Sequence, residues 1–131
     1  MKVFLYVGLG GFLGANLRFF VCDWAARKWG DQLPYGTFLV NILGSFVIGF
    51  LVMMIAEQFH VSPHLKQLVI TGFLGGFTTF SSFMFDAAQL LSKGTIGHSV
   101  FYMLVSLLLG FLAVLAGSAL GWHLAGIPID G

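Results

Sequence analysis

Four long apolar segments alternate along the chain with short stretches that carry most of its few charges. The apolar segments cover residues 3–22, 35–56, 66–86 and 97–122. A helix needs about 20 apolar residues to cross the hydrocarbon core of a bilayer, and each segment is about that long. We therefore expect an all-α integral membrane protein with four transmembrane helices, forming one membrane domain over residues 1–131.

Short connections are expected between the segments, near residues 23–34, 57–65 and 87–96. So little chain remains outside the segments that a soluble catalytic domain is excluded. The first segment could also be a signal peptide, because Lys2 precedes an apolar run. Asn16 and Arg18 interrupt that run, however, and no clear cleavage site follows. We therefore interpret it as a transmembrane helix.

The composition supports a membrane location. Hydrophobic residues make up 58% of the chain and charged residues 8%, whereas a soluble domain has about 25% charged residues. The net charge of +1 leaves no basic patch for nucleic acid, so no nucleic-acid partner is expected. Cys22 is the single cysteine, which excludes an intrachain disulfide and gives no metal-ligand spacing.

Glycine spacing predicts close packing between the helices. Three pairs have the G-x-x-x-G spacing: Gly10 with Gly14, Gly72 with Gly76, and Gly117 with Gly121. Small residues at this spacing let two helix backbones approach closely. The pattern is common in membrane helices, so it indicates packing and no particular function.

The basic residues give almost no preference for one orientation in the membrane. Lys2 and Lys66 lie on one side, and Arg27, Lys28 and Lys93 lie on the other. Basic residues normally concentrate on the cytoplasmic side. A chain with so small a difference can insert both ways and form an antiparallel homodimer. The alternative is one orientation, set by a marginal charge difference.

The third segment has an unusual centre. Residues 71–83 read TGFLGGFTTFSSF, with Gly75 and Gly76 followed by Thr78 and Thr79. Adjacent glycines and β-branched residues weaken a helix, and a break at membrane depth is tolerated only where protein or a cavity surrounds it. We expect a break in the third helix. The alternative is a glycine-rich packing face whose hydroxyls bond their own helix.

Two phenylalanines follow this centre, and polar residues surround them. Phe80 and Phe83 are three residues apart and share one helix face. Because an aromatic ring has a positive edge, rings can favour an anion without trapping it. The hydroxyls that interleave with the rings belong to Thr78, Thr79, Ser81 and Ser82. Without those hydroxyls, such a pair is more typical of a lipid-facing or core position.

Other polar residues share helix faces at membrane depth. Thr37 lies one turn before Asn41, and Tyr102 one turn before Ser106. Their N–H and hydroxyl groups could replace water around a dehydrated anion, or they could join neighbouring helices. Arg18 is deep enough to need a partner or a wet vestibule, although it could also extend to the end of its span.

These motifs together resemble one family. GANLR at 14–18, GTFLVN at 36–41 and GFLGGFTTFSSF at 72–83 are similar to the Fluc (CrcB) fluoride channels, and the likeness covers essentially the whole chain. The resemblance implies an antiparallel dual-topology homodimer in the inner (plasma) membrane. It further implies two pores for passive export of cytoplasmic fluoride, which would protect the cell from fluoride toxicity.

The resemblance also implies roles for individual residues. Backbone carbonyls matching Gly75 and Thr78 would hold a structural sodium ion at the dimer interface. The fluoride pore would be lined by residues matching Phe80, Phe83, Asn41, Thr37, Tyr102 and Ser106, with Ser81 beside the rings, and Arg18 would lie in the vestibule. Asp86 stands where the family often has glutamate, and it is either a vestibule carboxylate or a span boundary.

Three other functions fit the sequence less well. A small multidrug exporter also has four spans, but proton-coupled cation export needs an embedded carboxylate and no Asp or Glu lies in mid-span. A non-transporting adaptor leaves the polar residues of the third segment unexplained. A membrane enzyme would need a nucleophile, a base and an orienting group together, and none converge here.

Overall fold

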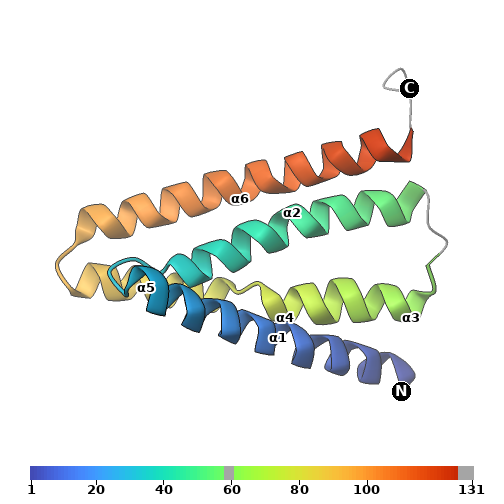
Figure 1. Cartoon of the computed structure of the whole chain (residues 1–131), viewed down its shortest axis with the longest axis horizontal. Helices are drawn as coiled ribbons and strands as arrows, with labels where there is room; N and C mark the ends of the chain where they lie inside the picture. The colour runs from blue at the N-terminus through green and yellow to red at the C-terminus, as the bar shows by residue number, and fades with distance from the viewer. Residues whose placement is uncertain (58–60, 127–131) are drawn as a thin grey trace.

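The computed structural model describes residues 1–57 and 61–126, and every regular element in these residues is a helix. The helices are α1 (Lys2–Trp29), α2 (Tyr35–Glu57), α3 (Pro63–Lys66), η1 (Gln67–Leu74), α4 (Gly75–Phe77), α5 (Phe80–Ser92) and α6 (Ile96–Ala125). η1 is a π-helix. The elements α3, η1, α4 and α5 follow one another along the third apolar segment (Figure 1).

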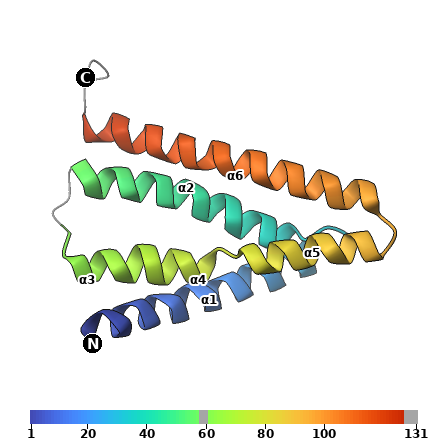
Figure 2. The same cartoon turned by 180° about the vertical axis from the view of Figure 1, so that it is seen from behind.

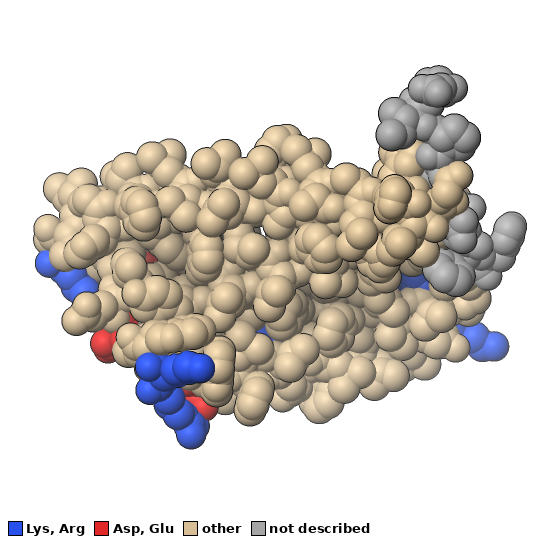
Figure 3. Space-filling view, turned by 45° about the horizontal axis from the view of Figure 1, so that its top comes forward, with Lys and Arg blue, Asp and Glu red and all other residues tan. Residues whose placement is uncertain are grey.

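Four helical stretches are long and apolar enough to cross a membrane, as predicted. They cover Lys2–Trp29, Tyr35–Ala56, Pro63–Ser92 and Ile96–Ala125. α2 and α6 lie side by side, and α1 runs along the third stretch (Figures 1 and 2). The charged side chains visible in Figure 3 gather mainly toward the two ends of the molecule. This distribution leaves a middle band with few charged side chains, which suits a bilayer.

Two helices extend into residues that the sequence assigned to connections. α1 continues to Trp29 and α5 continues to Ser92, so the connections span only residues 30–34 and 93–95. The prediction placed helix ends at the first charges, but charge does not end a helix. Arg27 instead pairs with Asp23 one turn earlier, which supports the last turns of α1 by about 0.3–0.5 kcal/mol. Residues 58–60 of the expected connection 57–65 lie outside the described residues.

The predicted close packing of the glycines is confirmed. A Cβ atom added to Gly10 would collide with the carbonyl oxygen of Leu68, and one added to Gly14 would collide with that of Phe73. On α6, a Cβ at Gly117 would likewise meet the α2 backbone. α1 therefore packs against η1 and α4, and α6 against α2, at distances that only glycine allows.

Candidate functional site: a polar groove at the junction of α4 and α5

Two residues at the centre of the third stretch have extended backbone. Thr78 has φ −83° and ψ 157°, and Thr79 has φ −153° and ψ 122°. The Thr78 hydroxyl donates to the Leu74 carbonyl at 2.9 Å. The Thr79 hydroxyl accepts from the Ser82 amide at 3.2 Å, which caps the start of α5. α4 therefore ends at Phe77, and α5 begins with its own cap.

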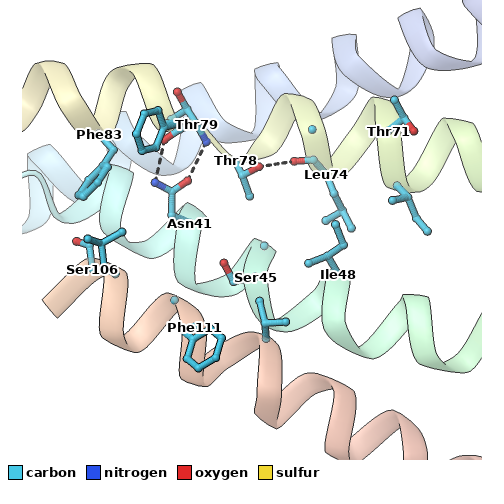
Figure 4. Close-up of a pocket in the computed structure, with 17 residues that line it drawn as sticks. Asn41, Ser45, Ile48, Thr71, Leu74, Thr78, Thr79, Phe83, Ser106 and Phe111 are labelled. Atoms are coloured by element: carbon cyan, nitrogen blue, oxygen red, sulfur yellow. Dashed lines mark hydrogen bonds between the residues drawn. The ribbon is translucent and has the colours of Figure 1, made fainter. Parts of the chain in front are cut away.

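The side chain of Asn41 bonds the backbone between α4 and α5. Its Nδ2 donates to the Thr79 carbonyl at 2.9 Å, and its Oδ1 accepts from the Thr79 amide at 2.8 Å (Figure 4). Asn41 thus replaces both hydrogen bonds that a helix would have given this residue. An unpaired backbone group in the membrane would cost several kcal/mol, so the two hydrogen bonds stabilise the junction. Because Asn41 belongs to α2, they also join α2 to the junction. One N–H of the amide remains available.

Two carbonyls at the junction lose their usual helical donors. In a continuous α-helix the amide of residue i+4 bonds the carbonyl of residue i. The Thr79 amide, which would bond the Gly75 carbonyl, donates to Asn41. The Ser82 amide, which would bond the Thr78 carbonyl, donates to the Thr79 hydroxyl. Gly75 is exposed, so an outside ligand can approach its backbone.

A groove of about 620 Å³ lies between α2, the third stretch and α6. Its lining contains six of the predicted site residues: Asn41, Gly75, Thr78, Phe80, Phe83 and Ser106 (Figure 4). None of the lining residues carries a charge. The structure therefore brings together most of the predicted site from three helices that are distant in sequence.

The two phenylalanine rings have different surroundings. Their centroids are 6.0 Å apart and their planes are tilted by 54°. Phe83 is only 4% exposed and its ring contacts that of Tyr102, with centroids 5.2 Å apart. Phe80 is 70% exposed. Phe83 therefore belongs to the core between α5 and α6, whereas Phe80 projects from the single chain.

Two buried hydroxyls beside Phe83 lack hydrogen-bond partners among the residues that the structure describes. They belong to Tyr102 and Ser106, which lie one turn apart on α6. An unsatisfied buried donor costs about 1–3 kcal/mol. These hydroxyls are therefore available to a water molecule or an ion beside the ring.

Thr37 lies apart from the groove, in a second cavity of about 210 Å³. Cys22, Asp86 and Lys93 also line this cavity. Asp86 Oδ2 is buried and has no hydrogen-bond partner in the described part of the chain. α5 continues to Ser92, so Asp86 lies within this helix and faces the second cavity; both interpretations of Asp86, vestibule carboxylate and span boundary, remain predictions.

Two predicted residues line none of the three cavities, and the groove is also lined by three polar residues that were not predicted, Ser45, Thr71 and Thr79. Ser81 is exposed on α5, and Arg18 is half-buried on α1. Ser45 stands four residues after Asn41 and eight after Thr37, so helical spacing alone could have identified it.

Fold and site together define a class: a multi-pass membrane protein with an uncharged polar groove between its helices. Comparison with known proteins then identifies the family and confirms the resemblance. The chain matches the family model described as CrcB-like protein, Camphor Resistance (CrcB), over residues 5–118, and it belongs to this family.

Three relatives illustrate the similarity, and each is named "Fluoride-specific ion channel FluC". The Agrobacterium fabrum protein is 47% identical over 90% of this chain and 94% of its own length. The Allorhizobium ampelinum protein is 48% identical over 92% and 97%, and that of Chloroflexus aurantiacus 41% identical over 92% and 96%. The chain is therefore a multi-pass protein of the plasma membrane, and its family is not one of enzymes.

Proposed function

We propose that this chain forms a fluoride-selective channel through which cytoplasmic fluoride leaves the cell passively. The observation that carries the proposal is the unpartnered buried hydroxyl of Ser106 in the groove, with the hydroxyl of Tyr102 one turn away on α6, where its ring contacts that of Phe83. A dehydrated anion needs donors, and these two are otherwise unsatisfied. The names of the relatives support fluoride as the anion.

The chemistry of the groove suits a small anion that must also leave quickly. Fluoride would exchange its water for donors from Ser106 and the remaining N–H of Asn41 in the groove, and from Tyr102 one turn before Ser106 on α6. Ring edges of Phe80 and Phe83 would add weak attraction. Because no charged side chain lines the groove, nothing there would hold the anion tightly. Thr37 would accept the ion from the second cavity.

No energy source is needed for export. Fluoride enters cells as the neutral acid and dissociates in a near-neutral cytoplasm. An inside-negative potential then favours exit of the anion by about 2.3 kcal/mol per 100 mV. A passive pore therefore suffices to protect the cell.

The working unit in this proposal is an antiparallel homodimer with two pores. Phe80 is 70% exposed, and Gly75 is exposed with open space around the position of a Cβ atom. A Cβ at any of the six glycines of the G-x-x-x-G pairs would collide with neighbouring backbone, whereas a Cβ at Gly75 would have only the Ile70 carbonyl oxygen nearby, at 4.0 Å. A second copy seated over the groove would cover both residues and complete the walls of each pore.

A sodium ion at the centre of this dimer is part of the proposal. The carbonyls of Gly75 and Thr78 have lost their helical donors, and oxygen ligands suit such a cation. Among the described residues, no group of three His, Cys, Asp or Glu side chains could hold a metal ion, so backbone oxygens would be the ligands. The ion would neutralise carbonyl dipoles of both copies.

Replacing sodium with N-methyl-D-glucamine during purification should lower the thermal unfolding temperature of the dimer, because an ion that binds only the folded state stabilises it. Stepwise return of sodium should restore it. Equal unfolding temperatures in both cations would exclude a stabilising sodium site.

Anion efflux from liposomes tests the channel directly. Wild-type protein should release fluoride much faster than chloride when a potential drives exit. Ser106→Ala should slow fluoride efflux about tenfold, since losing one donor costs about 1.4 kcal/mol. Ser118→Ala, on the same helix and away from the groove, is the matched control.

Other results would support other functions. Proton-coupled uptake of organic cations would indicate an exporter. The absence of any fluoride release from folded dimers would favour the adaptor.

A further inference from the structure

A third, smaller cavity, a groove, lies near one end of the molecule and shares Tyr102 with the proposed pore. It has a volume of about 110 Å³ and its lining is almost wholly apolar. Leu33, Tyr35 and Phe38 form one wall, at the start of α2 and the connection before it. Phe101, Tyr102 and Val105 of α6 form the other. Its chemistry suits a hydrocarbon chain.

A cation and three aromatic rings lie next to this groove. The ring of Tyr35 contacts that of Trp29, with centroids 5.8 Å apart. The Lys28 Nζ lies over the Trp29 ring at 5.6 Å and over the Trp24 ring at 5.0 Å. These contacts link the Lys28 ammonium to the groove through two touching rings.

Lys28 has no carboxylate partner in the described ranges 1–57 and 61–126. The adjacent Arg27 is paired with Asp23, so its charge is already balanced. Lys28 is exposed, so an anionic ligand can reach its ammonium group. Its position at the end of α1 is where hydrocarbon gives way to lipid headgroups, a level at which Trp, Tyr and Lys are typical.

We propose that this end of the chain binds an anionic phospholipid, with a segment of one acyl chain in the small groove and the phosphate at Lys28. A free phosphate would leave the apolar groove empty. A zwitterionic lipid would bring its own cation toward Lys28. An anionic phospholipid satisfies both parts of the surface with one molecule.

The bound acyl chain would pack against the back of a residue that the pore also uses. Tyr102 is 5% exposed and forms part of the groove wall, while its ring contacts that of Phe83. The lipid would thus support the position of Tyr102. The proposal goes beyond the channel function, and lipid binding can be measured without measuring fluoride.

Native mass spectrometry of the purified full-length protein, mixed with phosphatidylglycerol or phosphatidylcholine of equal chain length, tests this site. The wild type should retain phosphatidylglycerol about tenfold better than phosphatidylcholine, a difference of about 1.4 kcal/mol. Lys28→Gln should abolish that preference. Lys66→Gln, which removes a cation from the opposite end of the molecule, should keep it.

Filling the groove separates the acyl chain from the headgroup. Val105→Trp should abolish retention of phosphatidylglycerol, whereas Leu108→Trp, at a position that is 59% exposed on the same helix, should not. Equal retention of both lipids by the wild type overturns the proposal. The proposal is also overturned if Lys28→Gln retains as much phosphatidylglycerol as Lys66→Gln. This comparison introduces no large side chain that could disturb the fold. A groove covered by a second copy would retain no lipid, which also overturns the proposal.

Discussion

At the scale of single residues, the Asn41 side chain both stabilises the backbone of another helix and has a proposed part in fluoride binding. Both ends of its amide bond the backbone of Thr79, and they do so in a part of the chain that crosses the membrane. The remaining N–H is the part available to an anion. Asn41 therefore combines a structural contact with a proposed role in fluoride binding, and the two roles can be separated experimentally.

Asn41→Ala should destabilise the fold, because it leaves the Thr79 amide and carbonyl without partners. Each unpaired buried group costs about 1–3 kcal/mol. Ser45→Ala, one turn further on the same face of α2, is the control, since the Thr79 backbone bonds Asn41 and not Ser45. Thermal unfolding in detergent measures both variants. Equal unfolding temperatures would contradict a structural role for Asn41.

The two phenylalanines should respond differently to the same substitution. Phe80→Ile should slow fluoride efflux and cost less stability than Phe83→Ile, because Phe80 is 70% exposed in the single chain and only the proposed second copy covers it. Phe83→Ile should slow efflux and also destabilise the fold by about 1–2 kcal/mol, because Phe83 is in the core. Dimer assembly should persist in both. Liposome efflux measures conduction, and thermal unfolding measures stability. Full conduction by both variants would contradict the proposal that the ring edges of Phe80 and Phe83 attract fluoride.

At the scale of helices, the crossing of α1 with η1 and α4 depends on glycines. Gly10 faces backbone atoms of η1, whereas a Cβ at Gly8 on the same helix would meet nothing within 4 Å. Gly10→Ala should therefore destabilise the fold, since rigid backbone must move. Gly8→Ala should stabilise it by about 0.5–1 kcal/mol through lower chain entropy. Thermal unfolding of the Gly10→Ala and Gly8→Ala variants tests this packing of α1 against η1. Equal destabilisation by both variants would contradict it.

The third stretch illustrates what the sequence could predict and what it could not. Gly75, Gly76, Thr78 and Thr79 indicated a weak point, but the residues with extended backbone are the two threonines. The reason lies 38 residues away, in Asn41, which offers the Thr79 backbone other partners. Spacing within a helix can be read from a sequence, whereas a pairing between helices cannot.

The same limit applies to the site. Helical spacing placed Phe80 and Phe83 on one face, yet only Phe83 is buried, because α6 brings Tyr102 against it. Thr37 and Asn41 also share a face, but they line different cavities. The residue types of the site were predictable from the motifs. Their division between core, groove and surface depends on how α6 packs.

At the scale of the whole molecule, the near balance of basic residues between the two ends bears on orientation. Lys2 and Lys66 lie at one end, and Arg27, Lys28 and Lys93 at the other. A difference of one charge gives the insertion machinery little basis for a choice. An antiparallel dimer requires chains of both orientations in one membrane.

Cysteine labelling tests this orientation. On a Cys22→Ser background, Gln32→Cys reports on one end and Leu65→Cys on the other, without changing any charge. A membrane-impermeant thiol reagent applied from outside should label about half of each variant if both orientations are present. Complete labelling of one variant and none of the other would mean a single orientation and would exclude the antiparallel dimer.

The contact between Asn41 and Thr79 also orders the events of biosynthesis. A ribosome makes Asn41 before it makes Thr79, so the side chain that bonds the exposed backbone is already present when the third stretch enters the bilayer. The Thr79 backbone groups at the α4–α5 junction can therefore be paired as soon as they enter the bilayer. A circular permutant in which the third stretch is translated before α2 would reverse that order, and it should insert poorly although every contact of its final fold is unchanged.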